Sequence, residues 1–326
     1  MQRAFVALNT PVTLTGILAT IGTISTVLTL NRVLRFSWPY LRPSSVHRYI
    51  NPDSYALITG STGGIGKSIA AVLLSKGSNV IIHGRNPEKL ESVRSELQAK
   101  FSGRKVLAIC ASAEDPASSV PTIEKFIKDE GLCVTMLVNN VGGTAMFGLS
   151  YTVFGELEPE LLGRIITLNA VFPAQLTNSL IPLLGRTSSS VEQRPSLIMS
   201  IGSFADLQGI PLVSAYSGAK SLMHTLSKAL AWEVELFNRP IEVLSVTSGP
   251  VVAQHNSDET VSLSNPSSDT FAAAAVQRVG CGRRTVIGYF WHAVQLALVQ
   301  SFPERMQGKF VKAALWQRYE AEKKGN

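Results

Sequence analysis

Apolar residues along this chain occur in short runs that alternate with amphipathic stretches. The runs that we interpret as strands are residues 54–59, 79–83, 105–110, 134–138, 197–199 and 241–246. The stretches with helical spacing are residues 67–76, 87–100, 117–130 and 221–237. Apolar runs that alternate with helices are typical of parallel strands buried on both faces. The pattern therefore predicts an α/β fold, with a doubly wound parallel sheet in a single domain.

The first apolar stretch is too long for a strand. It runs without a charged residue over the 28 positions from Ala4 to Asn31, and a helix needs about 20 residues to cross a bilayer. A cleaved signal peptide would have a shorter apolar run, and a buried helix would contain fewer Thr and Gly residues. Arg3 precedes the stretch and four arginines follow it before position 50. We therefore predict a single-pass membrane-anchor helix with the rest of the chain in the cytosol, then a linker over residues 37–53.

Composition adds limits on partners and compartment. The chain has a net charge of +7, a pI near 9.4 and a mean hydropathy of +0.18. Its basic residues are scattered and not interleaved with aromatic residues, which favours membrane lipid over nucleic acid as a partner. Cys110, Cys133 and Cys281 lack paired spacing. We therefore expect a reducing compartment, no disulfide framework and no metal site.

A glycine-rich turn follows the first predicted strand. It contains Gly60, Ser61, Gly64, Ile65 and Gly66, and a helix and a second strand come after it. Glycines in this context let the backbone approach a pyrophosphate at the N-terminus of the helix. The turn therefore predicts a dinucleotide site.

Two further positions bear on the cofactor. Arg85 follows the second strand, where an NAD-selective site would carry a carboxylate, so we expect NADP(H), with a solvated loop charge as the alternative. Asn139 begins an Asn-Asn-Val-Gly turn after the fourth strand. Cofactors lie at this edge of parallel sheets, so we expect Asn139 to contact the cofactor, with an ordinary turn as the alternative.

A Tyr-Ser-Gly-Ala-Lys sequence begins the predicted helix that precedes the last strand. Tyr216 and Lys220 are four residues apart, so they lie on one helical face. A phenol has a pKa near ~10, and a neighbouring cation lowers it. Ser203, on the loop after residues 197–199, could hold a carbonyl oxygen beside the tyrosine. This Tyr/Lys spacing is common on helices. It indicates proton delivery to a ketone only because it occurs together with the nucleotide-binding motifs.

These motifs, in this order, make residues 54–250 resemble the short-chain dehydrogenase/reductase family. The resemblance implies a Rossmann-like fold and a catalytic tetrad of Asn169, Ser203, Tyr216 and Lys220. Tyr216 would be the general acid, and Ser203 would orient the carbonyl. Lys220 would lower the tyrosine pKa and bind the nicotinamide ribose, and Asn169 would order a water that relays protons. The resemblance also suggests a homodimer through the helices that carry Asn169 and Tyr216.

A narrower resemblance covers nearly the whole chain. The sequences RNPEKL, LVNNVG and IGSF and the tail over residues 267–298 resemble microsomal very-long-chain 3-oxoacyl-CoA reductases and related 17β-hydroxysteroid dehydrogenases. Lys323 and Lys324 resemble a dilysine signal for return to the endoplasmic reticulum. Two positions depart from the family pattern. Ala111 replaces an Asp that usually holds the adenine. The stretch 248–253 keeps the glycine of the family's Pro-Gly-x-x-x-Thr pattern but loses its proline and threonine, and we expect Val251 still to meet the nicotinamide amide through its backbone.

The C-terminal third is expected to serve the substrate. A polar stretch over residues 252–286 should close over it, and the apolar segment 286–302 should form an interfacial helix at the bilayer or a lipid-pocket wall, with core packing as the alternative. The expected domains are 1–53 for the anchor and linker, 54–253 for catalysis and 254–326 for the substrate loop, apolar helix and tail.

These expectations combine into a function. We expect an NADP(H)-dependent ketoreductase of the endoplasmic reticulum membrane that acts on a lipophilic ketone, with 3-oxoacyl-CoA as the leading substrate. A steroid, terpenoid or polyketide ketone is the alternative, and oxidation of the alcohol stays open. The rival of another class is a non-catalytic membrane scaffold, which the intact Ser/Tyr/Lys set disfavours.

Overall fold

The computed structural model describes residues 13–144, 147, 151–186, 193–253 and 259–325. These residues form two compact units, which divide after Arg42. In the larger unit the described strands form one parallel sheet of seven, in the order β3-β2-β1-β4-β5-β6-β7. The strands are β1 Ser54–Ile58, β2 Asn79–Gly84, β3 Val106–Cys110, β4 Cys133–Asn139, β5 Ser196–Ser203, β6 Ile241–Ser248 and β7 Thr285–Ile287.

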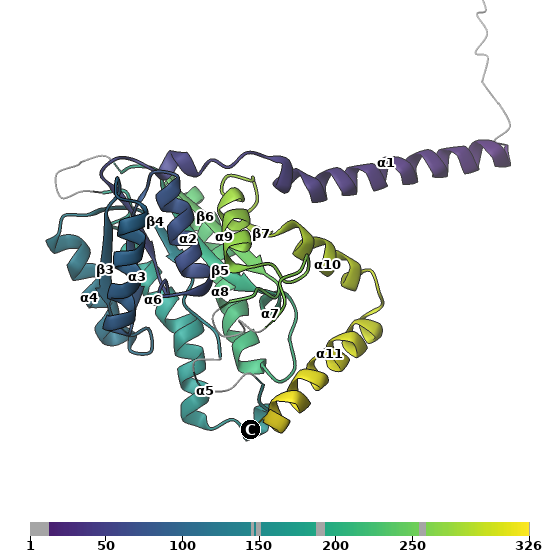
Figure 1. Ribbon diagram of the computed structural model, residues 1–326. Coiled ribbons are helices and arrows are strands. Elements are labelled where there is room, and N and C mark those ends of the chain that lie inside the picture. Colours follow the sequence, from purple (N-terminus) through teal and green to yellow (C-terminus); the bar gives the residue numbers. More distant parts are fainter. Residues whose placement is uncertain (1–12, 145–146, 148–150, 187–192, 254–258, 326) are drawn as a thin grey trace, which may run out of the picture. The chain divides into compact units, whose positions relative to one another are not determined.

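Helices cover both faces of this sheet (Figure 1). On one face, α2, α3 and α9 pack with alternate strand residues such as Ala56 and Ile58, and on the other, α4, α6 and α8 pack with the intervening ones, such as Leu57. The predicted doubly wound parallel sheet is confirmed. The longer helices of this unit are α2 Gly64–Ser75, α3 Pro87–Lys100, α4 Pro116–Asp129, α5 Pro159–Ile166, α6 Phe172–Leu180, α8 Ser214–Leu236, α9 Ser268–Gln277, α10 Phe290–Gln300 and α11 Glu304–Gly325.

Shorter helical turns join some of these elements. They are the 3-10 turns η1 Val46–Tyr49 and η3 Phe154–Glu156, the π-helical turn η4 Thr167–Val171 and the four-residue helix α7 Phe204–Leu207. The turn η4 joins α5 to α6, and α7 follows directly on β5. Both lie at the carboxyl edge of the sheet, where parallel sheets bind ligands.

The smaller unit contains the helix α1 Leu14–Leu41. Its most apolar 18-residue window has a mean hydropathy of 1.5 and no buried residue, so α1 is long and apolar enough to cross a membrane. Thr20 and Thr23 donate to backbone carbonyls four residues earlier, which satisfies their hydroxyls without water. The expected span began at Ala4, outside the described residues. The helix ends at Leu41, so the first residues assigned to a linker are helical instead.

The segment expected to form one apolar helix over residues 286–302 is divided. Val286 and Ile287 belong to the edge strand β7, and α10 begins only at Phe290. The break comes at Gly288, where an added Cβ would lie 2.7 Å from Val246 on β6. One face of α10 buries His292 and Leu296, as the core alternative predicted.

Candidate active site

Ser203 lies at the carboxyl end of β5 and forms the N-cap of α7. Its hydroxyl accepts a hydrogen bond from Ala205 N at 3.3 Å, and its backbone N–H donates to Asp206 Oδ2 at 2.9 Å. Tyr216 lies in the first turn of α8, and its phenol is close enough to the Ser203 side chain for that hydroxyl to lower the pKa of Tyr216. The structure therefore brings together two hydroxyls that are 13 positions apart in the sequence.

Lys220 follows one helical turn after Tyr216. Its ammonium donates to the carbonyl oxygen of Ile201 at 3.1 Å and lies 5.8 Å from the centroid of the Tyr216 ring. The side chain is buried between α8 and the end of β5. Ser203, Tyr216 and Lys220 thus converge at one point on the carboxyl edge of the sheet.

Asn169 completes this group from the π-helical turn η4. Its Nδ2 donates to Ile165 O at 2.9 Å and Gly143 O at 3.0 Å, and its Oδ1 accepts from Gly143 N at 2.8 Å. A Cβ added to Gly142 would lie 2.6 Å from Asn169 Oδ1 and 2.8 Å from Lys220 Nζ. Asn169 is buried and does not face solvent; it holds the glycine turn after β4 beside Lys220. Single π-turns inside helices often occur at functional sites.

The two titratable side chains are shifted in opposite directions. Burial raises the pKa of Tyr216 to about 12, the Ser203 hydrogen bond opposes this, and the charge of Asp206 adds to it. Burial lowers the pKa of Lys220 to about 8, against the charge of Asp206. Lys220 was expected to lower the tyrosine pKa; the net shift of the Tyr216 pKa is upward, and burial is its largest cause.

The glycine-rich turn packs closely on the turn after β4. A Cβ at Gly66 would lie 2.4 Å from Gly60 O and 2.5 Å from Asn140 Nδ2, and one at Gly60 would lie 2.9 Å from Val141 Cα. Asn140 donates to Thr59 O at 2.9 Å and Gly60 O at 3.1 Å. Asn140 therefore ties the two turns together, although the sequence did not single it out as a site residue; its place in the Asn-Asn pair was the available signal.

The N-terminus of α2 fits an anionic group. Gly64 begins the helix with a φ of 52°. The N-cap is Gly63, which has no side chain to accept hydrogen bonds from the first N–H groups of the helix. Free N–H groups and the helix dipole favour a phosphate here. Ser61 is fully buried and its hydroxyl donates to Ile58 O, so its side chain is engaged within the protein, and Ile65 packs on the apolar core.

The remaining predicted cofactor residues are Asn139, Arg85 and Val251. The Nδ2 of Asn139 donates to Thr177 Oγ1 on α6 at 2.8 Å, and its Oδ1 is buried without a hydrogen-bond partner among the described residues. Arg85 forms an ion pair with Glu114, and half of its side chain is exposed. Val251 is buried after β6, where His292 accepts a hydrogen bond from Gly249 N at 3.0 Å and holds this loop.

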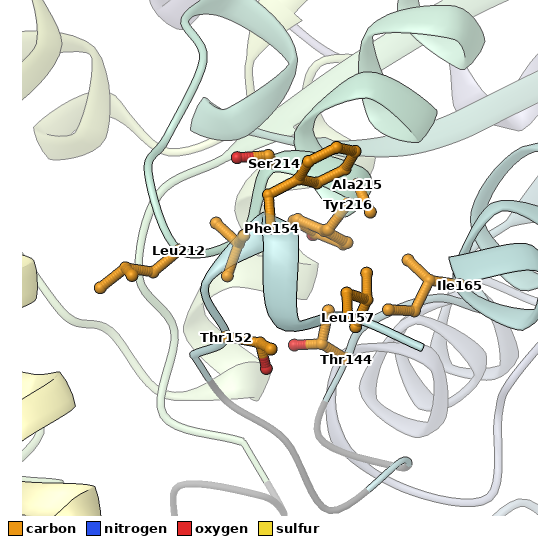
Figure 2. Close-up of a pocket in the computed structure, with 10 residues that line it drawn as sticks. Thr144, Thr152, Phe154, Leu157, Ile165, Leu212, Ser214, Ala215 and Tyr216 are labelled. Atoms are coloured by element: carbon orange, nitrogen blue, oxygen red, sulfur yellow. The ribbon is translucent and has the colours of Figure 1, made fainter. Parts of the chain in front are cut away.

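A pocket opens beside Tyr216 (Figure 2). Its empty space of about 320 Å³ includes open solvent. It is lined by Thr144, Thr152, Phe154, Leu157, Ile165, Leu212, Val213, Ser214, Ala215 and Tyr216. None of these described lining residues is charged, and most are apolar. The phenol therefore faces a space suited to a lipophilic group.

A family profile described as short chain dehydrogenase matches residues 54–262. The chain belongs to the short-chain dehydrogenase family. This matched region contains the glycine turn, the Asn-Asn turn and the Ser/Tyr/Lys group described above.

Curated relatives within this family share about a third of their residues with the chain. A very-long-chain 3-oxoacyl-CoA reductase of Scheffersomyces stipitis is 35% identical over 71% of this chain and 64% of its own length. One of Vanderwaltozyma polyspora is 30% identical over 80% of this chain and 76% of its own. The chain thus spans under two thirds of the first of these relatives.

Solved structures of the family share the fold. A short chain dehydrogenase of Burkholderia cenocepacia in complex with NADP covers 74% of this chain and 99% of its own, with a TM-score of 0.60 and 22% identity. A 3-ketoacyl-(acyl-carrier-protein) reductase of Brucella melitensis complexed with NADH covers 72% of this chain and 94% of its own, with a TM-score of 0.60 and 23% identity. At this level of identity, the similarity shows that this chain has the Rossmann-like architecture of the family.

Proposed function

We propose that this protein is an NADPH-dependent reductase of ketones on lipophilic substrates, with 3-oxoacyl-CoA as its leading substrate. The observation that carries the proposal is the convergence of Ser203, Tyr216 and Lys220 at an uncharged pocket. The names of the relatives support the substrate.

The site residues act on the carbonyl oxygen. The Ser203 hydroxyl orients that oxygen, and Tyr216 donates its proton to it. A raised pKa keeps the Tyr216 phenol protonated at neutral pH, so it is ready to act as an acid. The charge of Lys220 stabilises the phenolate that remains, and Asn169 holds the turn that borders the ammonium. The bound nicotinamide cofactor supplies the hydride that reduces the carbonyl carbon.

The cofactor would lie across the glycine turn, with its pyrophosphate at the N-terminus of α2. Arg85 follows β2, where a guanidinium can pair with a 2′-phosphate. Glu114 forms an ion pair with Arg85 and also bonds Arg164, at 2.7 Å. Ala111 is half-buried at the edge of the same region, so its methyl group packs where a carboxylate would bind the adenine.

Turnover by the purified full-length protein tests this proposal. Oxidation of NADPH is followed by absorbance with a long-chain 3-oxoacyl-CoA, a steroid ketone and a short ketone as substrates. We expect kcat/KM for the long acyl substrate to exceed that for the short ketone by about 100-fold or more, because each buried CH₂ contributes about 0.8 kcal/mol. Preference for the steroid would support the specialised-metabolism alternative. Tight NADPH binding without turnover on any ketone would support the scaffold.

Membrane lipid is a proposed partner, through α1 and the C-terminal helix. On α11, Val311 and Leu315 are half-buried, whereas Met306, Phe310 and Trp316 are 41–59% exposed. The exposed Arg305, Lys309 and Lys312 lie beside these apolar side chains. Apolar residues flanked by basic ones suit an anionic bilayer surface. An endoplasmic reticulum location, with the catalytic unit in the cytosol, is part of this proposal.

Vesicle sedimentation tests the two membrane contacts separately. Residues 43–326 form a unit with their own core, so a chain truncated before residue 43 can be compared with the full chain. We expect the truncated chain to sediment with anionic vesicles, and to lose this on combining Lys309→Glu with Lys312→Glu. A truncated chain that stays in the supernatant would leave α1 as the sole anchor.

A homodimer is the remaining proposed partner. Ile166 at the end of α5 and Leu222 on α8 are 37% and 48% exposed, on the helices that flank the catalytic group. Light scattering in detergent would test it. A Leu222→Glu variant that leaves the mass of the wild type unchanged would contradict a contact through α8.

A further inference from the structure

Asp206 is a buried carboxylate behind the catalytic serine. Its side chain is 0% exposed and lies between the end of β5, β6 and α8. Oδ2 accepts from Ser203 N at 2.9 Å, and Thr247 Oγ1 donates to Oδ1 at 3.4 Å. His224 Nδ1 lies 3.6 Å from Oδ1. All of these partners come from elements that carry the active site.

A glycine next to Ser203 leaves room for this carboxylate. A Cβ at Gly202, the residue before Ser203, would lie 2.1 Å from Asp206 Oδ2, so any other residue would displace it. Ser221 Oγ donates to the backbone oxygen of Asp206 at 3.1 Å, which ties α7 to α8. A buried carboxylate is costly, and a four-residue helix could be capped by a neutral side chain. A carboxyl group at this buried position therefore requires an explanation.

Three titratable groups face Asp206, and two of them belong to the active site. They are His224, Lys220 and Tyr216, all from α8, and β6 contributes the neutral Thr247. Burial raises the pKa of Asp206, and the Ser203 N–H, His224 and Lys220 oppose this. As a carboxylate, Asp206 raises the pKa of both Tyr216 and Lys220.

We propose that Asp206 is a positioning residue for the reduction: it holds the backbone of Ser203 and places a buried carboxylate beside Tyr216 and Lys220. This role rests on the proposed function, because it matters only where Tyr216 gives up a proton. It goes beyond helix capping, because a cap needs only an oxygen that accepts the Ser203 N–H.

The substitution Asp206→Asn separates the two parts of the role. The amide oxygen can still accept from Ser203 N, but the charge is gone. Loss of a negative charge lowers the pKa of Tyr216 and of Lys220, so the alkaline fall in kcat for ketone reduction should move to lower pH. Just above the shifted limb, kcat should be about 10-fold below the wild type if the shift is one unit. KM for the ketone should change less than about 2-fold, since Asp206 does not line the pocket.

Glu242→Gln is the matched control. Glu242 is a partly buried carboxylate on β6 that likewise accepts a backbone N–H, from Gly280 at 3.0 Å, and also bonds Tyr49. It lies at the opposite end of β6 from the site. Its replacement should lower the melting temperature and leave the pH profile in place. If the pH profiles of kcat for Asp206→Asn and Glu242→Gln shift equally, the effect is a general one of removing a buried carboxylate. That result would overturn the proposal.

A measurement that needs no turnover tests the role of Asp206 separately from the proposed function. Trace acetylation of Lys220 over neutral to alkaline pH, quantified by mass spectrometry of its peptide, reports the titration of this amine. In Asp206→Asn the midpoint should lie at lower pH than in the wild type. A wild type that reduces no ketone would defeat the proposed function and leave this shift measurable. A folded Asp206→Asn protein with an unchanged midpoint would overturn the role of Asp206.

Discussion

The ammonium of Lys220 donates to the backbone oxygen of Ile201 at 3.1 Å, and this contact joins α8 to the end of β5. Ser203 is two residues after Ile201, and Tyr216 is one helical turn before Lys220. The contact therefore fixes the strand that carries the hydroxyl against the helix that carries the phenol. Lys220 is a structural tie as well as a charge, so its replacement should disturb geometry and electrostatics together.

Tyr216→Phe should lower kcat/KM for ketone reduction by at least ~100-fold, because it removes the proton donor and leaves the ring in place. NADPH affinity, measured by fluorescence, should change little. Tyr55→Phe is the matched control, since Tyr55 is buried at the start of β1, at the opposite edge of the sheet. Near-normal turnover in Tyr216→Phe would contradict the assignment of Tyr216 as the acid.

The reduction rate should fall as the pH rises through about 8. Burial lowers the pKa of Lys220 to about 8, so the charge that stabilises the tyrosine phenolate is lost there. Tyr216 itself stays protonated over this range. A pH profile of kcat for the wild type and Lys220→Met measures the effect. The variant should be slower and lack this limb; a limb that persists in it must belong to another group.

The same shift links Lys220 to stability. The pKa of a lysine in water is 10.5 and that of Lys220 in the fold is about 8, so between these values the unfolded chain binds more protons than the native one. The contribution of Lys220 to the free energy of unfolding therefore rises with pH across this window. Urea unfolding in detergent should show the wild type gaining stability relative to Lys220→Met from pH 8 upward. A constant difference between the two would indicate that Lys220 is not desolvated.

Gly142→Ala should separate Asn169 from Lys220. The new Cβ would lie within 3 Å of both side chains, so at least one must move. We expect kcat to fall by about 10-fold or more, with a modest loss of melting temperature. Gly163→Ala on α5 is the control, because an added Cβ meets nothing within 4 Å there. Equal effects of the two substitutions on kcat would contradict the close approach at Gly142.

Arg85→Asp should raise KM for NADPH by about 10-fold or more and leave KM for NADH nearly unchanged, because the carboxylate repels a 2′-phosphate. Conversely, Glu114→Gln should lower KM for NADPH, since it removes the anion that pairs with Arg85. Arg94→Asp, on the exposed face of α3, is the control for net charge. Equal changes of both Michaelis constants in Arg85→Asp would defeat the assignment.

Most strands were predictable to within a residue or two. Runs such as the one at Val80–Ile82 are apolar throughout because both faces of the sheet are covered, and this leaves a continuous signal in the sequence. The prediction of one helix over the apolar segment 286–302 was wrong for the same reason. Val286 is apolar because it is in the edge strand β7, and Leu296 because it lies on the buried face of α10, so composition alone merged two elements into one.

Local spacing was enough to place Tyr216 and Lys220 on one face of a helix and the glycines between a strand and a helix, because helix pitch and chain order are properties of neighbours in the sequence. The pKa directions, the contact of Ser203 with the phenol and the carboxylate of Asp206 behind it depend on β5, β6 and α8 closing around one another. Desolvation and burial arise only when distant segments exclude water together, so the assembled fold alone decides which groups are charged.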